Sequence, residues 1–239
     1  MKLDILVFAV HPDDAELGCS GTILKHIALG KKVGIVDFTR GELGTRGTAE
    51  TRDEEAAESA RILGLHAREN LRFKDGFFKN DEAHQLEVIK MVRKYQPEII
   101  LTNALHDRHP DHGRAGDLAN DAIFLSGLIK IETKLDDGIA QAAWRPRLVL
   151  QYIQDRYIQP DIIIDITDFM EQKEQSIRAF KTQFDSPDNK EPQTYISSPE
   201  FLDSVTGRAR EYGKQIGVKY GEGFTSRKLL GVDNLFNLK

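Results

Sequence analysis

An almost unbroken apolar run near the start of the chain, Leu3–Val10, limits the folds open to this sequence. The run contains several β-branched residues, and a strand buried on both faces would hide it from water. Strands of that kind occur mostly in parallel sheets that helices cover on both sides. The run ends abruptly at His11, which is followed by Pro12 and two adjacent carboxylates, Asp13 and Asp14.

Further apolar runs alternate with segments of helical periodicity along the rest of the chain. This alternation predicts an α/β fold with a Rossmann-like, mostly parallel sheet and helices on both faces. Residues 125–145 fit neither pattern and are interpreted as a surface insertion. The expected strands are 3–10, 33–38, 69–73, 99–102, 148–153 and 162–166, and the expected helices are 16–29, 48 or 51 to 63, 81–95, 113–124, 167–184 and 199–216.

A second polar cluster, His106–His112, follows the apolar run Ile99–Thr102. In the common doubly wound strand order the first and fourth strands are neighbours, and ligands bind outside their carboxyl ends. The sequence therefore predicts a site at the carboxyl ends of strands 1 and 4, where both clusters meet in one cleft. Imidazole and carboxylate groups collected there suit a catalytic divalent metal, because buried charges need partners or a metal.

Three side chains of these clusters are candidate metal ligands: His11 and Asp14, three residues apart in a turn, and His112 across the cleft. Such a set leaves one coordination position for water, whose pKa zinc lowers to about 7. Asp13 cannot easily share the metal with its neighbour, because adjacent side chains point in different directions. It is therefore a candidate general base that acts on the water.

Other residues near the clusters have alternative interpretations. His109 could stabilise an oxyanion as a cation, and Asp111 could orient an imidazole and raise its pKa. Arg52 could reach into the cleft to bind a substrate carboxylate or carbonyl, or it could form a surface ion pair with Glu55. His106 lies near the predicted site but could be only a loop residue.

Composition narrows the function classes. The net charge is −5 and no basic block is present, so nothing indicates a nucleic acid or a membrane surface as partner. Cys19 is the only cysteine, and the N-terminal residues lack the pattern of a signal peptide, so we expect a cytoplasmic protein without an internal disulfide. Asp37 stands where a ribose-binding acid would lie, but the glycine fingerprint of a dinucleotide site is missing.

These motifs resemble the signature of the LmbE-like, or PIG-L, metal-dependent N-deacetylases. Within that family the chain looks most like the deacetylases of bacillithiol biosynthesis, on its length, on residues 218–224 and on the stretch around Arg108 and His109. The stretches that resemble the family signature are Ala9–Gly21, Thr39–Gly47, Arg52, Glu55, Leu63–Gly64, His109–His112 and Gly221–Phe224.

The resemblance implies a single deacetylase domain over residues 1–239, one Zn²⁺ per chain, and a homo-oligomer, either a trimer or a hexamer. It implies an N-acetylglucosamine-type sugar conjugate as substrate, such as N-acetylglucosaminyl malate. The alternatives are a deacetylase or amidase for another acetylated sugar or thiol conjugate, and a non-catalytic metal- or nucleotide-binding α/β module. The implied residue roles are His11, Asp14 and His112 as metal ligands, Asp13 as general base, His109 as acid or oxyanion stabiliser oriented by Asp111, and Arg52 and a mobile Tyr195 as substrate contacts.

Overall fold

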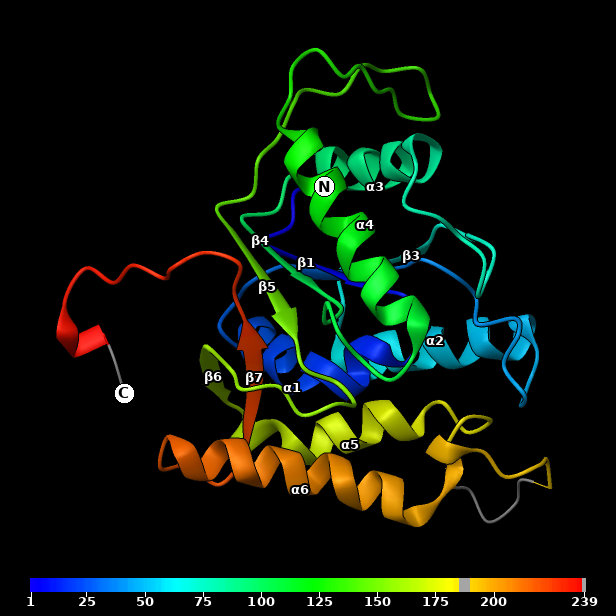
Figure 1. Cartoon of the computed structure of the whole chain (residues 1–239), viewed down its shortest axis with the longest axis vertical. Helices are drawn as coiled ribbons and strands as arrows, with labels where there is room; N and C mark the ends of the chain where they lie inside the picture. The colour runs from blue at the N-terminus through cyan, green and yellow to red at the C-terminus, as the bar shows by residue number, and fades with distance from the viewer. Residues whose placement is uncertain (185–189, 238–239) are drawn as a thin grey trace.

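The computed structural model describes residues 1–184 and 190–237, and a seven-stranded sheet forms its centre (Figure 1). The strands are β1 (Ile5–Ala9), β2 (Val33–Asp37), β3 (Ala67–Asn70), β4 (Ile99–Thr102), β5 (Leu148–Tyr152), β6 (Ile162–Asp165) and β7 (Gly221–Thr225). Their order is β3-β2-β1-β4-β5-β7-β6. The first five in this order are mutually parallel, and β7 runs antiparallel to both β5 and β6. The expected α/β class and the neighbouring positions of β1 and β4 are confirmed.

Helices cover both faces of the sheet. The helices are α1 (Asp14–Ala28), α2 (Ala49–Leu63), α3 (Glu82–Tyr95), α4 (Pro110–Ser126), α5 (Met170–Arg178) and α6 (Pro199–Gln215), with short 3₁₀ turns η1 (Thr167–Phe169), η2 (Tyr195–Ser197) and η3 (Leu235–Asn237).

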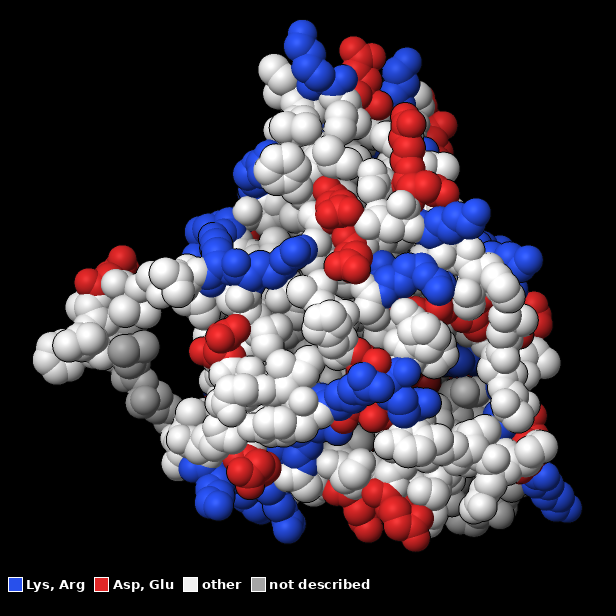
Figure 2. Space-filling model, viewed as in Figure 1, with Lys and Arg blue, Asp and Glu red and all other residues white. Residues whose placement is uncertain are grey.

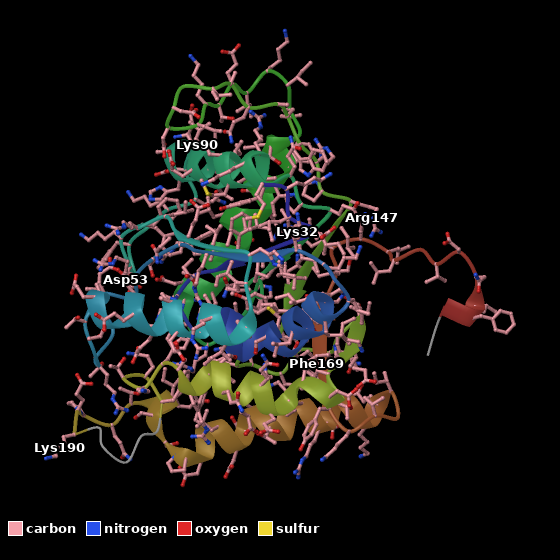
Figure 3. All side chains as sticks on the ribbon, turned by 180° about the vertical axis from the view of Figure 1, so that it is seen from behind. Lys32, Asp53, Lys90, Arg147, Phe169 and Lys190 are labelled. Atoms are coloured by element: carbon pink, nitrogen blue, oxygen red, sulfur yellow. The ribbon has the colours of Figure 1, made fainter. Side chains whose placement is uncertain are left out.

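In and just after β1, residues 6, 8 and 10 point into one core with α3 and α4, while residues 5, 7 and 9 point into a second core with α1. Below α1 and α2, α5 and α6 form a further layer, and Phe169 lies between α1 and α5 (Figure 3).

Three elements differ from the prediction by three residues or more at an end, while the other predicted elements differ by at most two. β3 lies at Ala67–Asn70 rather than 69–73, because its register is set by pairing with β2. α4 begins at Pro110 rather than Gly113: His109 caps the helix and Pro110 occupies its first turn, where a proline costs no hydrogen bond. α5 ends at Arg178, six residues before the expected end at Phe184. Of the two expected caps for α2, Thr48 is the one used.

β7 was not predicted as a strand, because glycine is depleted in strands and the segment Gly221–Thr225 shows no apolar alternation. Glycine suits these two positions of the strand because neighbouring side chains lie too close to leave room for a Cβ. A Cβ on Gly221 would lie 2.6 Å from Ile163, and one on Gly223 would lie 2.8 Å from Tyr212. The signal for this strand is thus in tertiary packing rather than in periodicity.

The segment between α4 and β5, expected to be a surface insertion, has no helix and only an isolated bridge between Lys134 and Ala140. Arg93 of α3 ties it down through bonds to the carbonyls of Ser126, Leu128 and Ile131. On the face shown in Figure 2, acidic and basic side chains are interspersed. Within residues 1–184 and 190–237, none of the helices has the length and apolar character needed to span a membrane.

Candidate metal and catalytic site

The turn after β1 carries the first group of site residues. Asp13 has a φ of 132°, a conformation that costs energy for any residue other than glycine. Asp13 precedes α1, yet its side chain makes no capping hydrogen bond. The strained backbone therefore turns this carboxylate away from the helix end and toward the cleft. Asp14, the first residue of α1, accepts a hydrogen bond from the backbone N–H of His11 at 2.9 Å.

The carboxylate of Asp14 lies between two imidazoles. Its Oδ1 is 3.2 Å from His112 Nε2, and its Oδ2 is 3.6 Å from His11 Nδ1. Gln154 and Asn103 also donate hydrogen bonds to it. Burial works to raise the pKa of Asp14, but the two imidazoles outweigh burial and hold the pKa well below its ordinary value. The carboxylate is therefore ionised and lies between two imidazole nitrogens.

Further carboxylates lie behind the two imidazoles. His11 Nε2 is 3.0 Å from Asp75 Oδ1 and 3.8 Å from Asp111 Oδ2, and His112 Nδ1 is 2.7 Å from Asp107 Oδ2. Burial lowers the pKa of both imidazoles, yet the surrounding carboxylates outweigh it: the pKa of His112 rises to about 9 and that of His11 rises well above its ordinary value. The site thus stabilises positive charge at its centre.

These groups fit a divalent metal of the zinc type. The donors are imidazole nitrogens and carboxylate oxygens, and a carboxylate accepts from the far nitrogen of His11 and of His112, as is usual for metal-bound histidines. The expected ligands His11, Asp14 and His112 are brought together. His11 also belongs to two groups of potential ligand atoms, and the atoms of each group all lie within 4.8 Å of one another. One group adds His109 and His112 to His11, and the other adds Asp75 and Asp111.

His109 lies beside these ligands, with its ring centroid 4.8 Å from that of His11 and 5.2 Å from that of His112. Its Nδ1 accepts a hydrogen bond from the backbone N–H of Asp111 at 3.3 Å, which places the proton of the neutral ring on Nε2. Burial and the charges of His11 and His112 lower the pKa of His109. The arrangement therefore favours a neutral donor at this position rather than the cation considered from the sequence.

The carboxylate of Asp111 faces His11, accepts a hydrogen bond from the backbone N–H of Gly76 at 2.8 Å, and pairs with Arg114 at 2.8 Å. Asp111 therefore contacts His109 through its backbone and His11 through its side chain.

The carboxylate of Asp13, the candidate general base, pairs with the guanidinium of Arg52, the candidate substrate contact. Arg52 Nη2 lies 2.9 Å from Asp13 Oδ2 and also donates to the carbonyl of Pro12. Arg52 is buried, and Glu55 accepts hydrogen bonds from Thr182 instead, so the alternative of a surface ion pair between Arg52 and Glu55 is wrong. Burial raises the pKa of Asp13 to about 7, against the opposing charge of Arg52.

A cleft of about 450 Å³ opens onto these residues. Tyr195 lies at its mouth, 59% exposed, with the guanidinium of Arg108 4.3 Å from its ring centroid and its hydroxyl 3.4 Å from Asp155. Tyr195 thus lines the same cleft as Asp13 and Arg52. Apolar side chains also line the cleft, those of Leu17, Leu43, Ile196, Phe201 and Val205.

Other residues weighed from the sequence lie outside this site. His106 is exposed and does not line the cleft. Cys19 is buried in the core, as expected. Asp37 forms a two-bond ion pair with Arg68, at 2.8 and 3.1 Å, which leaves its carboxylate committed to the protein rather than to a ribose.

Four residues that touch the expected ligands were given no role from the sequence: Asp75, Asn103, Gln154 and Asp107, which lies in the cluster His106–His112. All four follow strand β3, β4 or β5 within five residues. Polar residues beyond the carboxyl ends of parallel strands are the signal that could have found them.

Comparisons with known proteins identify the family of the chain. The family model described as PIG-L, GlcNAc-PI de-N-acetylase, matches residues 6–123. Diacetylchitobiose deacetylase of Thermococcus kodakarensis is 29% identical over 231 residues, which cover 92% of this chain and 81% of that protein.

Two solved structures share the fold over nearly the whole chain. The conserved protein TT1542 from Thermus thermophilus superposes with a TM-score of 0.85 at 35% identity, covering 97% of this chain and 98% of that one. N,N′-diacetylchitobiose deacetylase from Pyrococcus horikoshii superposes with a TM-score of 0.77 at 30% identity, covering 92% and 82%. The chain therefore belongs to the PIG-L, or LmbE-like, family.

Proposed function

We propose that this protein is a metal-dependent N-deacetylase that hydrolyses the acetamide of an N-acetylglucosamine-type sugar conjugate. One observation carries the proposal: two adjacent buried carboxylates have different surroundings. Asp14 lies between His11 and His112, whereas Asp13 faces Arg52 with a pKa of about 7. A permanently ionised ligand next to a base that titrates near neutrality is what metal-assisted amide hydrolysis requires.

The roles of the side chains follow from these positions. His11, Asp14 and His112 would hold a zinc ion, which when bound polarises the amide carbonyl and acidifies water. Asp13, ionised and held by Arg52, accepts a proton from the attacking water. His109, with its proton on Nε2, donates a hydrogen bond toward the oxygen or the departing nitrogen of the amide.

The substrate that we propose is N-acetylglucosaminyl malate, the acetylated precursor in bacillithiol biosynthesis. The proposal is supported by the resemblance of residues 218–224 and of the stretch around Arg108 to that branch of the family. Arg108 lines the cleft, where its Nε lies 3.1 Å from Asp155, and we propose that its guanidinium also binds a carboxylate outside the sugar. Diacetylchitobiose is the second candidate, because it is the substrate named for two relatives. The cleft of about 450 Å³ is the proposed binding place for either substrate.

The test is a panel of acetylated glucosaminides assayed for free amine and acetate, with added zinc and with a chelator. The panel contains N-acetylglucosaminyl malate, diacetylchitobiose, N-acetylglucosamine and a mercapturate-type thiol conjugate. We expect zinc-dependent release of acetate, fastest with the malate conjugate. Faster hydrolysis of diacetylchitobiose would replace the proposed substrate, and no hydrolysis of any acetamide would favour the non-catalytic α/β module.

Three broader features belong to the same proposal. Residues 1–239 would act as one deacetylase domain in a homo-oligomer, a trimer or hexamer, in the cytoplasm. Equilibrium sedimentation of the full chain measures the assembly directly, and a monomer at micromolar concentration would contradict it.

A further inference from the structure

Helix α1 is broken close to its start. Cys19, the sixth residue of the helix, has φ −150° and ψ 15°, which is outside the helical range. A buried ion pair fills the break: Lys173 Nζ of α5 lies 2.8 Å from Glu222 Oε1 of β7, with the two side chains 1% and 4% exposed. Neither residue lies among the ligands described above, and the reaction outlined above uses neither charge.

The ion pair is inserted into the hydrogen-bond ladder of the helix. Lys173 Nζ donates to the carbonyls of Glu16 and Leu17 at 2.9 and 2.8 Å. Glu222 accepts from the backbone N–H groups of Gly21 and Thr22 at 2.9 and 2.7 Å. In a regular helix the N–H of Gly21 would bond to the carbonyl of Leu17. Lys173 and Glu222 thus stand in for a backbone bond that the break has removed.

Close packing surrounds the break on the side of the sheet. A Cβ on Gly18 would overlap the ring of Tyr152, and one on Gly21 would lie 2.8 Å from Ile166. The two glycines allow the helix to approach the sheet on either side of Cys19. Because a buried ion pair costs about as much in desolvation as it returns, stability alone does not explain its presence.

We propose that Lys173 and Glu222 are positioning residues that hold the first turn of α1 in the orientation that aims Asp13 and Asp14 at their partners. The inference rests on the proposed metal site. The first turn contains Asp14 and ends at the carbonyls that Lys173 holds. Without the pair, the ladder can close between Gly21 and Leu17, which would rotate the first turn and move Asp14 away from His112.

The test compares zinc binding, measured by chelator competition without substrate, with thermal unfolding and kcat. The variants are K173M, which strands a buried charge, and K173M/E222L, which removes both charges. We expect about tenfold weaker zinc binding and a similar loss of kcat in K173M, the size usual for residues that orient metal ligands. The double variant should regain melting temperature but not zinc affinity, because nothing then holds the carbonyls of Glu16 and Leu17 in their present orientation.

Ile89→Ala is the matched control, since Ile89 is a buried core residue of α3 on the opposite face of the sheet. It should lower the melting temperature and leave zinc affinity within about twofold of the wild type. Wild-type zinc affinity in the double variant, or equal affinity losses in K173M and Ile89→Ala at equal melting temperature, would overturn the proposal.

If K173M does not fold, Glu222→Asp provides the same test. It keeps the negative charge and shortens the reach of the carboxylate toward the N–H groups of Gly21 and Thr22. We expect severalfold weaker zinc binding, and unchanged binding would overturn the proposal. Zinc binding needs no turnover, so a wild-type protein that binds zinc but hydrolyses no acetamide would refute the proposed function alone.

Discussion

The guanidinium of Arg52 and the carboxylate of Asp13 form a buried ion pair, with Nη2 and Oδ2 2.9 Å apart. Arg52 comes from α2 and Asp13 from the turn between β1 and α1, so the pair joins two elements at the edge of the cleft. Burial raises the pKa of Asp13, while the charge of Arg52 lowers it, and the balance lies at about 7. Arg52 therefore lowers the pH at which Asp13 ionises and could act as the proposed base.

Arg52→Gln should move the acidic limb of the kcat/KM profile to higher pH. Asp13 acts only when ionised, so activity falls as the pH drops through its pKa, and loss of the positive charge raises that pKa further above 7. The profile is measured at fixed zinc concentration. Arg40→Gln is the control, because Arg40 pairs with Asp53 outside the cleft. An acidic limb that stays in place in Arg52→Gln would show that Asp13 is not the group observed.

Asp13→Asn and Asp14→Asn separate the two adjacent carboxylates. Asp13→Asn should keep its zinc and lose about 10²–10⁴ in turnover, the usual contribution of a general base. Asp14→Asn should lose zinc and activity together, because Asp14 lies between His11 and His112. Metal content and turnover are measured on the same preparations. Zinc lost from Asp13→Asn and kept by Asp14→Asn would reverse the two roles.

Arg68→Leu tests a buried charge network next to the site. Arg68 pairs with Asp37 at 2.8 Å and with Glu16 at 2.6 Å, and all three side chains are at most 9% exposed. Removing the cation leaves two buried carboxylates without a counter-charge, which should lower the free energy of unfolding by about 3–5 kcal/mol in a urea titration. Arg61→Leu, which breaks an exposed pair with Glu58, should lower the free energy of unfolding much less, because exposed ion pairs contribute little to stability. Equal losses in the two variants would contradict this account.

Much of the fold could be predicted because its information is local. Apolar runs such as Ile99–Thr102 and capped helices such as α3 carry their own periodicity and end signals. β7 and the early end of α5 could not be predicted, since both depend on contacts between distant segments. The glycines of β7, for example, are explained only by Tyr212 and Ile163, which pack against them.

The candidate site divides in the same way. Residues that stand together in a short motif, such as Asp13 and Asp14, could be identified from their spacing and from the strand that precedes them. Asp75 could not, because its contact with His11 spans 64 positions and is made by the fold. The buried pair of Lys173 and Glu222 is harder still to predict from the sequence, since an isolated lysine on a helix is normally solvated.

Asp75→Asn and Asp107→Asn test the carboxylates behind the imidazoles. Each accepts a hydrogen bond from the nitrogen that faces away from the proposed metal, Asp75 at 3.0 Å from His11 and Asp107 at 2.7 Å from His112. Such carboxylates fix the ring orientation and strengthen the ligand, so each variant should bind zinc about 10–100-fold more weakly in chelator competition. The matched control is Asp81→Asn, which changes the partner of His84 at the exposed start of α3, 2.6 Å away. It contains the same aspartate–histidine chemistry and should leave zinc affinity unchanged. If Asp75→Asn and Asp107→Asn both bind zinc as tightly as this control, the two carboxylates do not act through His11 and His112, and the metal must lie elsewhere in the cleft.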